Sequence, residues 1–400
     1  MSDLLWPGDE RAGDLCTDAA VLAAMVAVEA AWLRALVAHG VAPADAADDL
    51  DKLVEPADAD GIARAAEGGG NPVIPLLALL RERLAARNEP AARWLHAGLT
   101  SQDVLDTALV LGLREAAATI SADLATQIAA VARLADEHRA TPMAGRTLTQ
   151  HAVPITFGLK AAGWLQGLLD ARDQLGAAAG LPAQFGGAAG SLAAPAALAG
   201  SAQAALDLAA TAAGTLGLAA RTPWHTHRGP LTRLADAFIA CTDAWGHIAG
   251  DVLVAARPEI GELAEPGGAG RGGSSAMPQK QNPILSVLIR RAALTAPQLS
   301  ATLHVAAAVA VDERSDGGWH SEWSTLRTLA RLTVTAGSQT AELLAGLRVH
   351  AHRMSANLTA ARPGIDAEQS KIAELTGSEP DGPYLGATEA IIDAALRRAG

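Results

Sequence analysis

The chain has 400 residues and a formal net charge of −12, and half of its residues are hydrophobic although only 3% are aromatic. This hydrophobic content excludes a disordered protein, and an acidic balance without a basic tract argues against a nucleic-acid-binding surface. A chain of this length is expected to fold as two or three domains or as one elongated helical body.

The N-terminal segment lacks the features of an export signal. It has neither a positively charged start nor an apolar stretch ahead of the first predicted helix. Cys16 and Cys241 are isolated and lack the spacing of a metal site or of a redox pair. We therefore expect a cytoplasmic protein with reduced cysteines and no bound metal.

The predicted elements are helices. Residues 18–39 place apolar side chains on one stripe, and a second helix over 76–87 follows a glycine-rich loop. A long helix begins near residue 100, where Thr100 or Ser101 can cap its N-terminus and Asp103 lies in the first turn. Further long helices are expected over 147–169, 230–256 and 283–311.

Strand signals are scarce, since the sequence has no Asn-Gly hairpins and no alternating β-branched runs. No repeat of fixed period is present. We predict an all-α protein in three parts, which are an N-terminal helical domain, a central bundle of long helices with an irregular loop at 267–283, and a short C-terminal helical domain. The predicted boundaries are 1–97, 98–346 and 347–400.

Residues 174–206 carry no charged side chain. Two prolines and several glycine pairs interrupt this segment, and its apolar residues are mainly alanine. A membrane span needs about 20 consecutive and more strongly apolar residues. We expect helices joined by a glycine-rich turn instead.

The irregular loop contains GRGGSSAMPQKQNP at residues 270–283. Its glycines fit the spacing of a dinucleotide-binding loop, but no hydrophobic strand precedes them, and the pattern of a nucleoside-triphosphate loop is absent. A mobile linker is an alternative for any segment rich in glycine and serine. Against a linker, Lys280 and Asn282 lie beside Pro283 at the start of a predicted helix, where they and the helix N-terminus can bind a carboxylate.

The segment GGSSAMPQKQNP resembles the signature loop of the fumarase/aspartase superfamily. GLTSQDVLDTALVL at 98–111 and GRTLTQHAVPITFGLKAAGW at 145–164 resemble the other two regions that this superfamily shares, in the same order. Three more segments are similar to the 3-carboxy-cis,cis-muconate cycloisomerase branch: GNPVIPL at 70–76, PWHTHRGPL at 223–231 and GGWHSEW at 317–323.

The resemblance implies a homotetramer whose central helices form a bundle of twenty and whose active sites each collect regions from three subunits. It also implies a cofactor-free reaction in which a proton is removed beside a carboxylate and a group leaves the neighbouring carbon, or the reverse. By position in the motif, Ser274 is the base, while Lys280 and Asn282 bind the carboxylate. The other substrate-binding candidates are Thr100, Ser101, Gln150, His151, His96, Asn71, Ser275 and Met277.

Several of these candidates have structural alternatives. Thr100 and Ser101 also fit a plain helix cap. His96 and His151 can each bind a substrate carboxylate, but each can equally be a hydrogen-bonded structural histidine.

The chain departs from the superfamily pattern at two pairs of positions. Leu148 and Val287 stand where fumarases and adenylosuccinate lyases have a His and a Glu that act together in acid–base chemistry. Without a general acid, the leaving group must be a weak base such as a carboxylate, whose conjugate acid has a pKa of about 4. Gln279 and Gln281 replace cations that cycloisomerases carry beside the loop lysine. The loop therefore offers less positive charge to bind a tricarboxylate.

The predicted function is therefore a lyase or cycloisomerase that acts on a small di- or tricarboxylate, with 3-carboxy-cis,cis-muconate cycloisomerase as the nearest likeness. A lyase that releases nitrite from nitrosuccinate and forms fumarate is the alternative within the same chemistry. A non-catalytic scaffold of the superfamily is a third possibility, against which the intact Ser274, Lys280 and Asn282 argue.

Overall fold

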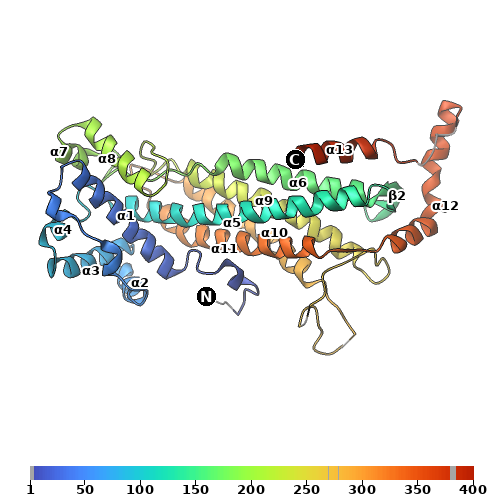
Figure 1. Cartoon of the computed structure of the whole chain (residues 1–400), viewed down its shortest axis with the longest axis horizontal. Helices are drawn as coiled ribbons and strands as arrows, with labels where there is room; N and C mark the ends of the chain where they lie inside the picture. The colour runs from blue at the N-terminus through green and yellow to red at the C-terminus, as the bar shows by residue number, and fades with distance from the viewer. Residues whose placement is uncertain (1–3, 269, 278, 379–383) are drawn as a thin grey trace. The chain divides into compact units, whose positions relative to one another are not determined.

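The computed structural model describes residues 4–268, 270–277, 279–378 and 384–400, and helices dominate them (Figure 1), which confirms the all-α class. The α-helices are α1 Asp18–Ala38, α2 Asp58–Gly69, α3 Val73–Ala85, α4 Glu89–Trp94, α5 Ser101–Glu137, α6 Phe157–Ala178, α7 Ala193–Ala199, α8 Ala202–Thr215, α9 Gly229–Ala255, α10 Ile284–Ala308, α11 Gly317–Ala345, α12 Ala351–Thr376 and α13 Thr388–Ala399. Short 3-10 helices lie at Asp9–Ala12, Ala44–Ala46 and Leu50–Leu53, and the strands are β1 Pro142–Thr147, β2 Gln150–Thr156, β3 Leu263–Ala264 and β4 Arg348–Val349.

The chain forms two compact units, each assembled from three separated segments. Unit 1 contains the chain up to Thr119, Leu175–Ala237 and Pro297–Val334, and unit 2 contains Ile120–Gln174, Phe238–Ala296 and Thr335–Gly400. Long helices such as α5 contribute residues to both units. The division into three domains stays a prediction.

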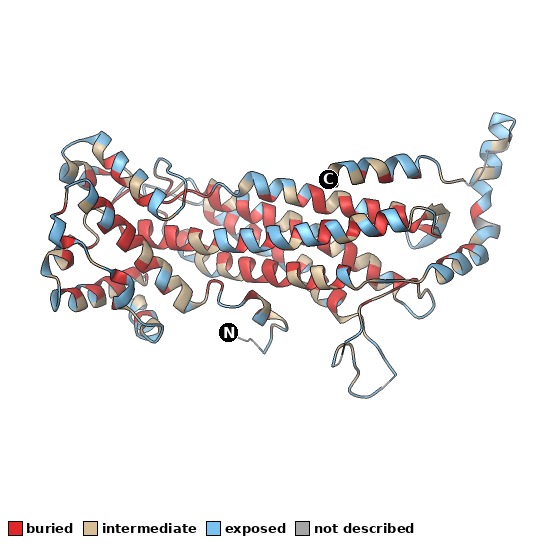
Figure 2. Cartoon of the chain, in the orientation of Figure 1, coloured by how far each residue is buried: buried red, intermediate tan, exposed pale blue. Residues whose placement is uncertain are grey.

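In unit 1, α1 is the central apolar helix. The Thr17 hydroxyl caps its N-terminus by accepting a hydrogen bond from the Ala20 amide. Trp32 is fully buried and stacks on Phe185 at a ring-centroid distance of 5.3 Å. By length and composition α1 could cross a membrane, but 61% of its most apolar stretch is buried within the protein, as in the core helix of a globular domain (Figure 2).

The uncharged segment 174–206 follows the prediction of helices joined by a glycine-rich turn. It contains the end of α6, an irregular stretch, the short helix α7 and the start of α8. Gly187 and Gly190 within the irregular stretch have φ angles of 68° and 75°, a conformation that glycine adopts without strain.

Unit 2 corrects one predicted helix. A helix was expected over 147–169, but β1 and β2 form an antiparallel hairpin there, and α6 begins only at Phe157. The β-branched residues of QHAVPIT favour a strand over a helix. The two-residue turn is formed by Leu148 and Thr149, with φ angles of 48° and 70°. Such a turn is normally signalled by Asn-Gly, so the sequence carried no hairpin signal.

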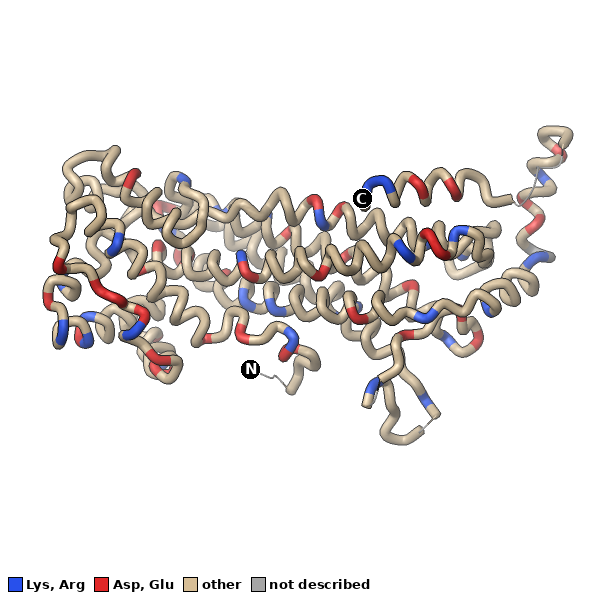
Figure 3. The backbone as a smooth tube through the Cα atoms, viewed as in Figure 1, with Lys and Arg blue, Asp and Glu red and all other residues tan. Residues whose placement is uncertain are grey.

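The C-terminal helices of unit 2 pack in different ways. The apolar residues Leu358 and Ile365 of α12 pack against Ala144 of β1. Ion pairs hold α13, since Arg398 binds Asp170 and Asp173 of α6 at 2.6 and 2.7 Å. Figure 3 shows the acidic residues of α13 in its first part and its basic residues at its C-terminal end, where Arg398 lies.

Candidate active site

The predicted catalytic loop, residues 267–283, connects β3 to α10, and we call it the lid. It extends away from the helices of unit 2 and is mostly exposed (Figures 1 and 2). Ala269 and Pro278 of the lid lie outside the described residues. The Ser274 hydroxyl is partly exposed and accepts hydrogen bonds from the backbone amides of Ala276 and Met277, with N···O distances of 3.4 and 3.2 Å. These amides can stabilise negative charge on the Ser274 oxygen.

The lid is held in shape by contacts between its two arms. The Asn282 amide donates to the Gly272 carbonyl oxygen at 2.8 Å. Gly272 has a φ of 71°, and a Cβ atom there would lie 2.6 Å from the Asn282 carbonyl oxygen, so only glycine fits. Lys280 is exposed, as are Ser275 and Met277.

The N-terminus of α10 differs from the expected carboxylate receptor, because a carboxylate of the protein already occupies it. The buried Glu265 side chain accepts from the amides of Leu285 and Ser286 at 3.0 and 2.7 Å, and from the Ser286 hydroxyl at 2.6 Å. Carboxylate binding by the side chains of Lys280 and Asn282 stays a prediction, and the Asn282 side-chain amide donates to the Gly273 carbonyl oxygen at 3.5 Å. Glu265 also ties the start of the lid to its end.

In unit 1, an arginine that the sequence analysis did not single out contacts a predicted substrate-binding residue. Arg314 donates from Nη2 to the Thr100 hydroxyl and, at 3.1 Å, to the Ala188 carbonyl oxygen. Its Nε is buried without a hydrogen-bond partner. Neither Thr100 nor Ala188 offers a charge, and no ion pair of Arg314 is found within the part of the chain that the structure describes. This leaves a guanidinium whose charge can meet a substrate carboxylate.

Thr100 and Ser101 lie at the start of α5, as the helix-cap prediction expects, and their role in substrate binding stays a prediction. Ser101 is the first residue of α5, and Thr100 precedes it at the capping position. Ser101 is partly exposed and Thr100 is 9% exposed. A hydroxyl at a helix N-terminus can bind an anion as well as cap the helix.

Asn71 and His96 have local structural contacts. The Asn71 side chain accepts from the Val73 amide and donates to the Gly69 carbonyl oxygen, both at 3.1 Å, so it orders the start of α3. His96 Nδ1 lies 2.6 Å from Oε1 of the buried Glu29. A role in substrate binding stays a prediction for both.

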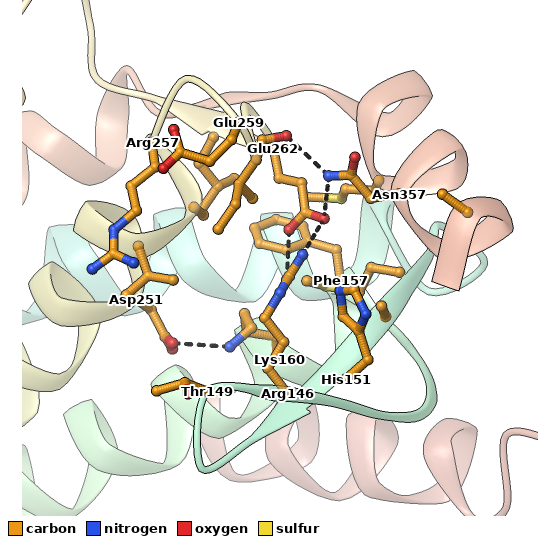
Figure 4. A pocket seen from close by; sticks show the side chains of 18 residues that line it. Arg146, Thr149, His151, Phe157, Lys160, Asp251, Arg257, Glu259, Glu262 and Asn357 are labelled. Carbon is orange, nitrogen blue, oxygen red and sulfur yellow. Dashed lines mark hydrogen bonds and ion pairs between the residues drawn. The ribbon is translucent and has the colours of Figure 1, made fainter. Parts of the chain in front are cut away.

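Gln150 and His151 are exposed residues of the β-hairpin in unit 2. His151 borders a cavity of about 540 Å³ (Figure 4). Two cations in this cavity are neutralised, since Lys160 binds Asp251 at 3.0 Å and Arg146 binds Glu262 through two contacts of 2.8 Å. The acidic and basic side chains that line the cavity balance one another, so the cavity carries little net charge.

Both cysteines are free and buried. Burial raises the pKa of the Cys16 thiol and raises that of Cys241 to about 12, so neither is a nucleophile near neutral pH. Across the described ranges, no group of three or more His, Cys, Asp or Glu side chains could hold a metal ion.

Comparison with known proteins decides the family. A family model described as a lyase matches residues 14–297. The chain is 49% identical over 350 residues to a nitrosuccinate lyase of Streptomyces davaonensis, covering 86% of this chain and 73% of that protein. It is 41% identical over 390 residues to a 3-carboxy-cis,cis-muconate cycloisomerase of Bradyrhizobium diazoefficiens, covering 96% and 84%. The chain belongs to the fumarase/aspartase superfamily of lyases.

A solved structure of the same superfamily shares the fold along almost the whole chain. The 3-carboxy-cis,cis-muconate lactonizing enzyme of Pseudomonas putida superimposes with a TM-score of 0.85 at 32% identity, covering 97% of this chain and 96% of that one. The resemblance read from the sequence motifs is thereby confirmed.

The two superfamily positions that lack their acid–base residues are both at the surface of the chain. Leu148 is 96% exposed at the tip of the hairpin, and Val287 is 45% exposed in the first turn of α10. Neither apolar side chain can transfer a proton, and neither is buried within the described part of the chain.

Proposed function

We propose that this enzyme is a lyase that cleaves a small dicarboxylate, nitrosuccinate, into fumarate and nitrite. The observation that carries the choice is the cation count at the predicted site. In the lid, Arg271 is paired with Glu342, which leaves Lys280 between the neutral Gln279 and Gln281. Together with an Arg314 contributed by another subunit, Lys280 gives two cations, among the described residues, that we propose for the two carboxylates of the substrate. The 49% identity to a nitrosuccinate lyase supports the same choice.

In the proposed reaction, Ser274 removes a proton from the CH2 carbon of nitrosuccinate. The electron pair of the broken C–H bond forms the C=C bond of fumarate, and the C–N bond breaks with its electrons leaving on nitrite. Charge develops on the carboxylate beside the deprotonated carbon, and Lys280 and Asn282 stabilise it. The amides of Ala276 and Met277 lower the cost of the anionic form of Ser274.

The second carboxylate binds to Arg314 with the hydroxyls of Thr100 and Ser101, which a different subunit of the tetramer proposed below contributes. Two carboxylates held by separate groups fix the orientation of the CH2 carbon toward the base. Closure of the glycine-rich lid excludes water, which strengthens these electrostatic contacts.

Nitrite leaves without help from a general acid because it is a weak base. This accounts for the apolar Leu148 and Val287, since protonation of such a leaving group adds little to the rate. The reaction is redox-neutral and uses only proton transfer and bond cleavage, so we propose that it needs no cofactor or metal.

We further propose a cytoplasmic homotetramer in which three subunits contribute to each active site. On α10, Val287, Leu294 and Val305 are 45%, 66% and 61% exposed. Exposed apolar side chains along one helix are typical of a surface that packs against another subunit. If other subunits pack against α10, they also lie close to the lid, because the lid directly precedes α10 in the chain.

A second candidate is the cycloisomerisation of 3-carboxy-cis,cis-muconate. It is favoured by the extent of the structural match to the lactonizing enzyme. In that reaction a carboxylate, another weak base, adds to a double bond, so the same absence of a general acid fits.

An ultraviolet assay that offers nitrosuccinate, 3-carboxymuconate and argininosuccinate side by side tests the proposal. We expect turnover of nitrosuccinate, with nitrite and fumarate released in equal amounts. Faster turnover of 3-carboxymuconate would replace the proposed substrate by the second candidate. No turnover of any substrate by an intact tetramer would favour a non-catalytic scaffold.

A further inference from the structure

The glycine-rich turn within the uncharged segment 174–206 surrounds the side-chain carboxylate of Asp103. Asp103, in the first turn of α5, is fully buried. Its Oδ1 accepts from the Gly186 amide and from His225 Nε2, both at 2.8 Å. Its Oδ2 accepts from the Gly187 amide at 2.9 Å and from the Thr100 amide at 3.1 Å. Four donors therefore converge on one side chain that no substrate can touch.

The glycines at this carboxylate are required by the close approach of the backbone. A Cβ atom on Gly186 would lie 2.7 Å from Cε1 of His225. A Cβ on Gly187 would lie 3.1 Å from the Gly98 carbonyl oxygen, and its φ of 68° disfavours any other residue. The loop is thus shaped to bring its amides to Asp103.

The same loop also contacts Arg314, the arginine proposed to bind a substrate carboxylate. Ala188 follows Gly187 directly, and its carbonyl oxygen accepts from Arg314 Nη2 at 3.1 Å. That nitrogen also donates to the Thr100 hydroxyl, while the Thr100 amide returns to Asp103. Hydrogen bonds therefore link Asp103 to Gly187, Ala188 to Arg314, Arg314 to Thr100, and Thr100 back to Asp103. Because Gly187 and Ala188 are neighbours in the chain, these contacts form a closed ring.

We propose that Asp103 is a positioning residue, which sets the location of Arg314 and Thr100 and thereby the affinity for the substrate carboxylate. This inference rests on the proposed function, in which Arg314 and Thr100 bind that carboxylate. Asp103 acts only through them, because its side chain is enclosed by its own four donors.

Asp103→Asn tests the proposal, because the substitution changes few atoms but replaces one acceptor oxygen by an NH2 group that faces N–H donors. The loop must then turn away, and Ala188 moves with it. We expect KM to rise about tenfold while kcat changes less than about threefold, the size of effect of one charge-assisted hydrogen bond. Gly187→Ala, which displaces the same loop without altering the carboxylate, should raise KM in the same direction.

Asp106→Asn is the matched control, one turn further along α5. Asp106 is equally buried and binds Arg228 and Trp319, but it contacts none of the proposed substrate-binding groups. This variant should lose thermal stability without a rise in KM. An equal rise in KM for both variants would show a general packing effect and overturn the proposal.

A double-mutant cycle separates positioning from structure. In an Arg314→Ala background, Asp103→Asn should raise KM by less than about twofold further, because coupled residues are non-additive. Its effect on the melting temperature should persist in that background. The same rise in KM with and without Arg314 would contradict an action through Arg314.

Hydrogen exchange gives a readout that needs no substrate. The amides of Gly186 and Gly187 should be protected in the wild-type protein and should exchange faster in Asp103→Asn but not in Asp106→Asn. Unchanged exchange would overturn the proposal. If the wild-type enzyme turned over none of the offered substrates, the proposed function would fail. The role of Asp103 would still be decided by hydrogen exchange and by calorimetric measurement of fumarate binding, both made on the same variants.

Discussion

Replacing Ser274 by alanine removes the proposed base without disturbing the fold. The Ser274 hydroxyl makes two backbone contacts, at 3.4 and 3.2 Å, in an exposed loop. Water can satisfy both amides after the substitution, so stability should change by less than about 0.5 kcal/mol, as for other surface positions. Any large loss of turnover is then a loss of chemistry.

The size of that loss follows from the role assigned to the hydroxyl. A positioned general base contributes about 10²- to 10⁴-fold, or about 2.7–5.4 kcal/mol in the activation barrier. We expect kcat to fall by this factor, with KM within about threefold of wild type because Lys280, Asn282 and Arg314 still bind the carboxylates. Initial rates of fumarate formation, measured by absorbance together with a nitrite assay, give both constants.

Ser275→Ala is the control for this experiment. Ser275 is the adjacent residue, exposed and of the same chemistry, so its substitution should reduce kcat far less. If Ser274→Ala kept more than about a tenth of wild-type turnover, the proton transfer would not depend on it. If Ser275→Ala were the inactive variant, the base would be the second serine of the pair.

Three further predictions concern the leaving group, the lid and the thiols. Leu148→His should leave kcat within about threefold of wild type, because a weakly basic leaving group gains little from an acid; a large gain measured with nitrosuccinate would contradict the proposed role of nitrite. Glu265→Ala should destabilise the protein by about 2–3 kcal/mol, because two amides and a hydroxyl of α10 lose their acceptor, whereas Glu259→Ala, at an exposed position, should not lower the melting temperature. Cys16 and Cys241 should resist a thiol reagent at about pH 8 and react once unfolded, because burial raises both pKa values and keeps the thiols protonated. Rapid labelling of the native protein near neutral pH would refute this assignment. The raised pKa of Cys241 stabilises the folded protein fully below pH 9.0, the ordinary pKa of the unfolded thiol, and this contribution to stability should be lost as the pH rises from 9.0 towards about 12.

The sequence predicted the helical class of the fold, and the candidate site residues that it named lie in contiguous motifs, with roles that stay predictions. The helix class followed from composition and apolar spacing, and the start of α5 followed from the capping pattern at Thr100 and Ser101. The lid was recognisable because Ser274, Lys280 and Asn282 lie within nine residues of one another.

Contacts between distant parts of the chain could not be predicted in this way. Arg314 lies 214 residues from Thr100, and nothing in its local sequence announces that contact. The α10 N-terminus looked free because its partner, Glu265, lies 20 residues upstream of Leu285. The β-hairpin was missed because Leu148 and Thr149 adopt a turn that their side chains do not favour. Each case depends on tertiary structure overriding or adding to a local preference.

The tie between Glu265 and the start of α10 has an evolutionary consequence. Because both ends of the lid are fastened to one buried carboxylate, the residues between them can change without altering the helices that carry them. Replacements within the lid, such as Gln279 and Gln281, therefore change the charge of this loop at little cost to folding. If the lid binds substrate as proposed, a new substrate preference can evolve by substitutions in this loop while the helices stay the same.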